Sequence, residues 1–278
     1  MMNNEWIHHY TSLDTLELIL KSGRIRFSRL DMVDDLNESK AYGDHDFSKF
    51  LFVSCWTDLG EESIPQWKMY ADLLKGVRIS LPKNFFPQYP FDPPPTLGIT
   101  VQDRIRFPVR WDEIFTAEYW LQPIFLYESW FGKKVTYIDN IIGLFKNNFS
   151  LSRDVQRREN LNIQEMNTFA CYKQKEWQFQ SEYRFILCAF PPLKFPAGGF
   201  NNGHFVEKYS IHHVECIKEG RHPSVEFIDI DFGNGFQYVR FTLGPKCDEY
   251  DVGRLLALTK KYAPSATISK STLSGTIR

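Results

Sequence analysis

The sequence predicts a single α+β domain over residues 1–278, built on an antiparallel or mixed β-sheet. Segments in which apolar and polar residues alternate, or which are apolar throughout, are more frequent than segments with helical spacing. The helical segments are scattered among these strands, without the regular strand–helix alternation of a parallel sheet. Apolar residues make up 43% of the chain and aromatic residues 16%, so we also expect a large core rich in rings.

Charge and cysteine content limit the class of protein. The net charge is −1, which provides no overall positive field for nucleic acid or an anionic membrane. The chain has no apolar run of about 18 residues that would span a bilayer, and its first residues lack the layout of a secretion signal. The five cysteines form no CxxC pair, so a disulfide scaffold or a zinc knuckle is not expected. We therefore expect a cytoplasmic protein with no membrane partner and no bound metal.

The N-terminal segment begins with a predicted strand over 5–10. Thr11 and Asp14 have the spacing of a capping box, and the apolar residues around and after them recur at helical spacing. Gly23 stands where a glycine commonly ends a helix, and residues 24–28 alternate as a strand does. The sequence therefore predicts a strand, a helix and a second strand in succession, followed by an acidic loop.

Two further strands flank a short helix in the next segment. Residues 50–56 are almost continuously apolar and predict a buried strand. Pro65 is well placed for the first turn of a helix, and Gly76 precedes another strand-like run. Residues 82–98 then form an irregular insertion, because the six prolines over 82–95 cannot sit in central strands or helix interiors.

The C-terminal half combines helical and strand-like patterns. Residues 139–176 are predicted to be largely helical, and 180–190 to form a strand that becomes buried. Two alternating runs flank residues 233–235 (Gly-Asn-Gly), a sequence typical of a hairpin turn. Residues 248–262 are predicted to form the last helix.

Three short segments carry side chains that could form a site, and each also has a purely structural interpretation. His9 ends the first strand, where it either faces a cleft or is half-buried and bonded to the backbone. Glu182 precedes an apolar run and is either functional or part of a surface ion pair with Arg184 or a neighbouring lysine. Trp67 and Tyr70 share a face of the predicted helix and line either a ligand or the core.

Other groupings point to chemistry more weakly. Cys55 and a histidine could form a nucleophile pair, although a cysteine in a buried strand more often packs as a small apolar residue. Three polar clusters could each bind a ligand or could simply be solvated. A cation could be bound by Asp34, Asp35, Asn37 and Glu38, and zinc by His212, His213 and Cys216. A phosphate could be bound by Arg104, Arg106 and Arg110.

The order of these features resembles the diphtheria-toxin-like ADP-ribosyltransferases, the class that includes the poly(ADP-ribose) polymerases. In that class a strand ends in a histidine followed closely by a small hydroxyl residue, as in residues 9–12 (HYTS) here. A later helix carries a tyrosine, which Tyr70 matches, and a glutamate at a late strand closes the site, which Glu182 matches. The resemblance implies a split antiparallel or mixed sheet with flanking helices.

The sequence also resembles, over most of its length, a widespread bacterial family of uncharacterised function. Its members share the HYTS start, an acidic turn that matches 35–38, a WxxY helix and a segment that matches 177–184. A late Leu-Gly-Pro, residues 243–245 here, also agrees. The chain departs from the transferase class at Trp67, where many polymerases have a serine.

The resemblance to the transferases implies an enzyme that cleaves NAD and transfers ADP-ribose to a protein or a nucleic acid. Glu182 would stabilise the oxocarbenium-like ribose, His9 would hold the other ribose, and Tyr70 would stack on the nicotinamide. The residues expected to contact NAD are His9, Tyr10, Thr11, Trp56, Trp67, Tyr70 and Gln180.

Enzymes of this class often serve as toxins or in defence against phage, so an antitoxin or other regulatory protein is a candidate partner. Two other functions use the same residues: hydrolysis of NAD with water as acceptor, and non-catalytic binding of a nucleotide or a protein. A thiol hydrolase built on Cys55 is a further hypothesis. The NAD hypotheses share one spatial expectation, which is that His9, Tyr70 and Glu182 converge in one concave pocket.

Overall fold

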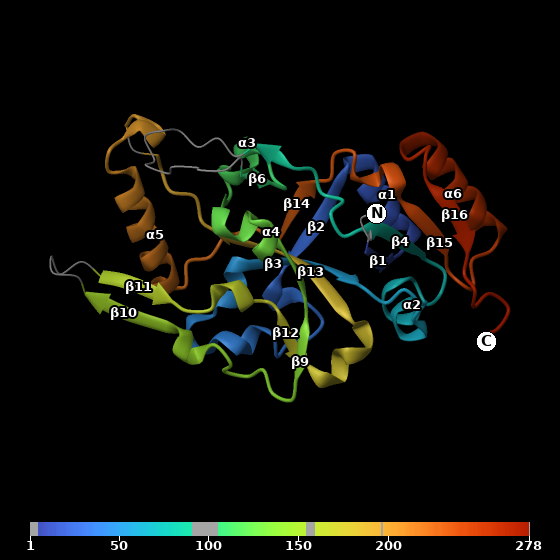
Figure 1. The fold of residues 1–278 in the computed structure, drawn as a ribbon, viewed down its shortest axis with the longest axis horizontal. Helices are drawn as coiled ribbons and strands as arrows, with labels where there is room; N and C mark the ends of the chain where they lie inside the picture. The colour runs from blue at the N-terminus through green and yellow to red at the C-terminus, as the bar shows by residue number, and fades with distance from the viewer. Residues whose placement is uncertain (1–4, 91–104, 154–158, 196, 278) are drawn as a thin grey trace.

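The computed structural model describes residues 5–90, 105–153, 159–195 and 197–277, which form a mixed α+β fold (Figure 1). A large mixed sheet lies at the centre with helices packed around it, and this confirms the predicted α+β class. That the whole chain is one domain stays a prediction. Among the described residues, no helix combines the length and the apolar character needed to cross a bilayer.

The helices and strands have the following bounds. The helices are α1 (Leu13–Ser22), α2 (Ile64–Tyr70), α3 (Trp111–Ile114), α4 (Glu128–Phe131), α5 (Phe205–Glu219) and α6 (Glu249–Tyr262). The strands are β1 (Trp6–Thr11), β2 (Arg24–Arg29), β3 (Leu51–Thr57), β4 (Val77–Pro82), β5 (Tyr89–Pro90), β6 (Arg106–Phe107), β7 (Trp120–Leu121), β8 (Gly132–Lys134), β9 (Thr136–Ile138), β10 (Phe149–Arg153), β11 (Glu159–Ile163), β12 (Tyr172–Gln174), β13 (Glu182–Phe190), β14 (Phe227–Asp231), β15 (Arg240–Leu243) and β16 (Thr267–Lys270).

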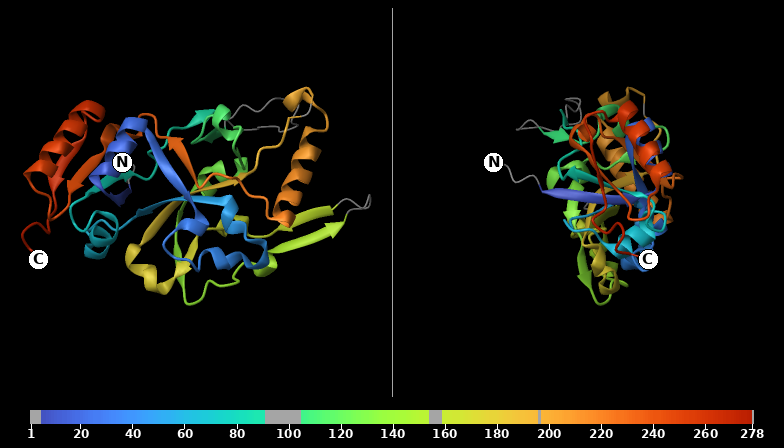
Figure 2. Two further views of the ribbon diagram at one scale, coloured as in Figure 1. Left: turned by 180° about the vertical axis from the view of Figure 1, so that it is seen from behind. Right: turned by 90° about the vertical axis from the view of Figure 1, so that its right-hand side faces the viewer.

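The main sheet follows the order β14-β2-β3-β1-β4-β15-β16, and β13 pairs with β3 as well as with β7 and β8. The strand pairs along this order are antiparallel, except that β15 and β16 run parallel. Figures 1 and 2 show α6, β15 and β16 at one end of the long axis, and α5 with the β10–β11 pair at the other. The centre of the molecule is therefore the part of the sheet where β1, β2, β3 and β13 meet.

The sheet opens along one edge of β3. On its other edge, β3 pairs continuously with β13, from Thr57 opposite Glu182 to Leu51 opposite Cys188. On the open edge, β2 pairs with β3 only near Val53, and β1 pairs with it only at Thr57. Because β1 and β2 diverge, residues 54–56 of β3 have neither strand beside them, and α1 connects β1 to β2 across this gap.

The two faces of β13 pack into different cores. Phe185 and Leu187 point into a core that also holds apolar residues of α1, α6, β1 and β4. Ile186 and Phe190, on the other face, point into a second core with apolar residues of 30–53, 141–171 and α5. Since successive side chains of a strand point to opposite faces, this alternation fixes which residues of β13 share the face of Glu182.

Most of the predicted N-terminal elements are present, with changes at the helix ends. Ser12, not Thr11, caps α1, because its side chain accepts a hydrogen bond from the backbone N–H of Thr15, while Thr11 is still part of β1. Gly23 ends α1 in the left-handed conformation, as predicted. The helix that contains Pro65 stops at Tyr70, because the backbone at 72–74 takes positive φ values.

The prediction of a largely helical segment over 139–176 is wrong. Its described part contains the antiparallel pair β10–β11 and the strand β12, which lies parallel to β9. In the backbone register of β10 and β11, Phe149 is paired with Ile163 and Leu151 with Leu161, so apolar residues recur in the sequence with the period of a strand. Residues 154–158 lie outside the described part of the chain.

The hairpin predicted around residues 233–235 is also wrong. β14 pairs with β2 and β15 pairs with β4, so the two runs join different parts of the sheet, and a 3-10 helix (Gly235–Tyr238) separates them. Each run buries its apolar face more fully beside its own neighbour than it would in an isolated hairpin. Of the proline-rich insertion over 82–98, residues 91–98 lie outside the described residues, and Pro82 ends β4.

Candidate active site

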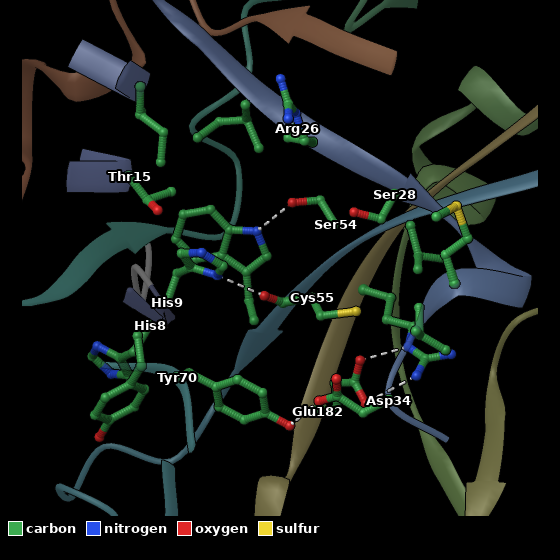
Figure 3. A pocket seen from close by; sticks show the side chains of 18 of the residues that line it. His8, His9, Thr15, Arg26, Ser28, Asp34, Ser54, Cys55, Tyr70 and Glu182 are labelled. Atoms are coloured by element: carbon green, nitrogen blue, oxygen red, sulfur yellow. Dashed lines mark hydrogen bonds and ion pairs between the residues drawn. The ribbon is translucent and has the colours of Figure 1, made fainter. Parts of the chain in front are cut away.

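A pocket of about 590 Å³ occupies the gap where the sheet opens. Its walls come from β1, α1, β2 and β3, with further side chains from α2, β12 and β13. Six predicted site residues line it together: His9, Tyr10, Trp56, Tyr70, Gln180 and Glu182. Figure 3 shows the hydroxyl end of Tyr70 beside Glu182, with His9 above the Tyr70 ring. The spatial expectation of the sequence analysis is met, since the proposed trio shares one concave site.

Two predicted contacts with NAD are not among the lining residues. Trp67 is fully buried and packs edge to face on Tyr10, with ring centroids 4.8 Å apart, while its indole N–H donates to Glu62. Thr11 is buried at the end of β1, opposite Val77 of β4. The helix face that holds Trp67 therefore belongs to the core, and Tyr70 at the end of the same helix reaches the pocket.

The carboxylate of Glu182 is buried and held by two cations. Its Oε1 lies 2.6 Å from Nε of Arg184, and its Oε2 lies 3.0 Å from Nη2 of Arg184 and 3.3 Å from Nζ of Lys173. On its other side Arg184 donates two hydrogen bonds to the carboxylate of Glu38. Each of the four side chains is at most 4% exposed. They form a neutral cluster of two acids and two bases under the pocket.

The cations decide the charge state of Glu182. Burial by itself raises the pKa of this carboxyl, but Arg184 and Lys173 more than offset burial, so the pKa lies well below its ordinary value. Burial likewise lowers the pKa of Arg184, and the charges of Glu182 and Glu38 outweigh it and raise that pKa. Both groups are therefore ionised at neutral pH.

A chain of hydrogen bonds connects this cluster to Tyr70. Lys173 donates to Oε1 of Gln180 at 2.9 Å, and Nε2 of Gln180 donates to the Tyr70 hydroxyl at 2.6 Å. The Tyr70 hydroxyl in turn donates to Asp34 at 2.7 Å. Burial and the adjacent Asp34 raise the pKa of Tyr70, so its hydroxyl stays protonated. The side chains of α2, the acidic turn and β13 are thus fixed relative to one another.

On the open edge of β3, the His9 side chain makes a hydrogen bond that a neighbouring strand would otherwise make. Its Nδ1 lies 2.9 Å from the backbone oxygen of Cys55. A carbonyl oxygen only accepts, so Nδ1 carries the proton. Burial lowers the pKa of His9, which keeps the ring neutral. The other ring nitrogen, Nε2, is then an acceptor, and the ring lies 5.2 Å from that of Trp56 between centroids.

The nucleophile hypothesis for Cys55 has no support in this geometry. Burial raises the pKa of the thiol far above its ordinary value, and Glu182 raises it further. The neighbouring His9 bonds to the backbone oxygen of Cys55 through Nδ1. Arg184 and Lys173 lower this pKa, but burial and Glu182 outweigh them, so the thiol stays protonated.

The weaker polar clusters have structural partners. Glu38 neutralises Arg184, and Asp34 accepts from Tyr70, so the acidic turn supports the pocket. His212 lies 3.6 Å from the sulfur of Cys216 inside α5. Across the described ranges, no three histidine, cysteine or acidic side chains are placed to share a metal ion.

Two arginines of β2 line the side of the pocket opposite Glu182, and Figure 3 shows Arg26 there. Arg26 pairs with Asp229 through two contacts of 2.9 and 3.0 Å, and Arg24 lies 2.8 Å from Glu113. Both arginine side chains are about half exposed, and such pairs contribute little stability, so their guanidinium groups can turn to an anionic ligand.

The sequence analysis missed this pair of arginines. Arg24 and Arg26 are two residues apart on a strand and share a face, which is the signal that could have found them. It singled out Arg104, Arg106 and Arg110 instead. Arg106 donates to the backbone of Gln88 and Arg110 pairs with Asp112, neither lines this pocket, and Arg104 is outside the described residues.

Comparisons with protein-family models, with curated proteins and with solved structures find no match to this chain. The functional argument therefore depends on the pocket itself.

Proposed function

We propose that this protein cleaves the bond between nicotinamide and ribose in NAD and transfers ADP-ribose to a macromolecular acceptor, a protein or a nucleic acid. The observation that carries the proposal is the convergence of His9, Tyr70 and Glu182 in one pocket, from segments far apart in the sequence. The pocket also combines aromatic walls with cationic side chains, which suits a dinucleotide that has rings at its ends and a diphosphate between them.

The electrostatics of Glu182 define its role in this reaction. Loss of nicotinamide leaves an oxocarbenium-like ribose, which a fixed carboxylate stabilises. Arg184 and Lys173 occupy most of the acceptor positions of this carboxylate and neutralise its charge. Glu182 therefore acts mainly by holding a hydroxyl of the nicotinamide ribose in a fixed place, with its anchors preventing rotation toward solvent.

The other residues orient the rest of the substrate. Nε2 of His9 accepts a hydrogen bond from a hydroxyl of the second ribose, which the fixed proton on Nδ1 makes possible. The Tyr70 ring stacks on the nicotinamide, and Trp56, whose ring lies 5.2 Å from that of His9 between centroids, bounds the apolar wall. Arg24 and Arg26 are placed to meet the diphosphate, which two guanidinium groups bind well.

Two alternatives use the same pocket. Hydrolysis of NAD differs only in that water replaces the acceptor. Non-catalytic binding of a nucleotide is the second alternative, and the neutralised charge of Glu182 is the observation in its favour. A toxin-like or anti-phage role, with an antitoxin or regulatory protein as partner, is part of the proposal for the transferase alone.

The test uses NAD labelled in its adenylate phosphate, incubated with the purified protein and with cell extract. We expect release of nicotinamide and retention of label on macromolecules, and we expect Glu182→Gln to lower release by about 10²–10³-fold. Glu62→Gln changes another carboxylate, outside the pocket, and should leave the rate unchanged. Circular dichroism checks that both variants are folded.

The outcomes separate the three functions. Free ADP-ribose with no labelled macromolecule supports the hydrolase. Calorimetric binding of NAD without nicotinamide release supports the binding module. If NAD neither binds nor is cleaved, the proposal fails.

A further inference from the structure

A second pocket, of about 660 Å³, lies between α5 and the β10–β11 pair, away from the opening of the sheet. Figure 1 shows α5 beside β11 at the end of the molecule opposite α6. The pocket includes Cys188 and Phe190 from the last residues of β13, whereas the first pocket includes Glu182 and Arg184 from its beginning. Its volume is in the range of pockets that hold a small organic molecule.

Apolar side chains from four segments form most of its wall. Phe125 follows β7, Phe190 ends β13, Ile163 ends β11, and Val214 and Ile217 come from α5. The described lining contains no lysine or arginine, and Glu207 is its one ionisable acid apart from the cysteine and tyrosine groups. The environment therefore favours an apolar ligand body and gives no counter-ion to an anionic one.

Three polar side chains meet at one place on this wall. Nε2 of Gln122 lies 2.6 Å from Nε2 of His213 and donates to the Tyr209 hydroxyl at 3.1 Å. Since Gln122 supplies both amide hydrogens, His213 Nε2 is the acceptor, and burial lowers the pKa of His213 to about 3, which keeps it neutral. The Tyr209 hydroxyl accepts from Gln122, and no described residue accepts its own proton through a hydrogen bond in the structure.

We propose that this pocket binds a small uncharged molecule with an apolar body and a carbonyl-type oxygen. That oxygen accepts a hydrogen bond from the Tyr209 hydroxyl. The donor is fixed by Gln122, and Gln122 is fixed in turn by His213 and by its backbone N–H, which donates to Cys188. A carboxylate ligand would lose its hydration without gaining a cation, so an amide, ester or ketone fits the polar cluster better. This inference does not depend on NAD chemistry.

The experiment compares three probes by titration followed by ligand-observed NMR: N-methyloctanamide, octanoate with the same chain length, and toluene. We expect the amide to bind with a dissociation constant of about 1 mM or tighter, and octanoate to bind at least about tenfold more weakly. Tyr209→Phe should weaken amide binding by about five- to tenfold and leave toluene unchanged, because it removes one hydrogen bond and keeps the ring.

A second variant tests whether the probes bind in this pocket. Val214→Trp fills it and should abolish binding of both the amide and toluene, whereas Lys208→Trp, on the exposed part of α5, should change neither. Thermal unfolding checks the fold of each variant, and Tyr209→Phe keeps the test decisive if Val214→Trp does not fold. The proposal is overturned if the amide shows no saturable binding, if octanoate binds equally well, or if Tyr209→Phe has no effect.

Discussion

The two halves of β13 carry two kinds of pocket on the same face of one strand. The first half places Glu182 and Arg184 in a buried, charged cluster beside the opening of the sheet. The second half places Cys188 and Phe190 beside a largely apolar pocket whose described lining holds no cation. The difference follows from what surrounds each half. An acid, Glu38, and a cation, Lys173, from two other segments reach the first half, and only neutral side chains bond in the polar cluster of the second. A strand thus supports charged chemistry only where complementary charges converge on it.

The largest expected effect is the loss of stability on removing Arg184. Arg184→Met leaves Glu182 and Glu38 buried with Lys173 as their one remaining cation in the cluster. We expect the free energy of unfolding to fall by about 3–5 kcal/mol, measured by urea denaturation. Arg26→Met, in a half-exposed pair with Asp229, is the control and should cost at most about 1 kcal/mol. Equal losses in the two variants would show that the cluster is not buried as described.

At the apolar end of β13 we expect a substitution to lower the free energy of unfolding by nearly as much, for a different reason. Phe190→Ala removes a ring that contacts Phe50 at 4.8 Å and His213 at 4.2 Å between centroids. The expected destabilisation is about 3 kcal/mol, from lost burial and a residual cavity. Urea denaturation at low and high salt checks this, because this loss should not depend on salt. A marked salt dependence would contradict the contrast between the two halves.

The two halves should also lose stability in different pH ranges. His213 stays neutral in the folded protein to about pH 3 but takes up a proton in the unfolded chain near 6.5, so its contribution declines as the pH falls below 6.5. The pKa of Glu182 is depressed in the folded protein, so its full contribution to the free energy of unfolding is present above its unfolded pKa of 4.5. That contribution is lost only as the pH falls below 4.5.

Stability measured against pH for three proteins tests this order. The difference between the wild type and His213→Gln should begin to shrink below about pH 6.5, and the difference between the wild type and Glu182→Gln below about pH 4.5. If both differences begin to change at the same pH, the assignment of charge states is wrong.

The smallest expected effect concerns the hydrogen bonds that join Tyr70 to the charged half. Tyr70→Phe removes the hydroxyl that lies between Asp34 and Gln180 and keeps the ring for stacking. We expect a loss of about 1 kcal/mol in the free energy of unfolding, with little change in calorimetric affinity for NAD. Tyr238→Phe, at an exposed tyrosine, is the control and should change neither quantity. A large loss of affinity would show that the hydroxyl itself contacts the substrate.

Local patterns were sufficient to predict β1, α1, β2, β3, α2 and β13, which line the first pocket, but not β12. The apolar run before Thr57, the glycine at Gly23 and the proline at Pro65 each mark an element that the structure contains. The β10–β11 pair was missed because its apolar residues alternate only over short stretches on either side of a charged segment. α5 was not predicted at all, because the preceding proline- and glycine-rich loop hid its start.

The site residues were predicted by their order along the chain. Of the side chains that support them, the pairing of Arg184 with Glu182 was foreseen only as a surface ion pair, whereas it is buried. Glu38 and Arg184 are 146 residues apart and bond directly. Lys173 fell in a segment predicted to be helical, so nothing placed it near Glu182. Ion pairs between distant segments depend on the topology of the sheet, which composition and spacing do not encode. Trp67 shows the reverse case, in which a matching motif position lies inside the core.

The pairing of β13 with β3 has a consequence for the order in which the protein opens. A slip by one residue would turn Tyr183 and Phe185 toward the acids and bases and bring Glu182 and Arg184 against an aromatic core. Such a register shift is too costly in free energy to occur as a local fluctuation. The amide protons that bridge these two strands should therefore exchange with deuterated solvent last, and at a rate set by unfolding of the whole molecule.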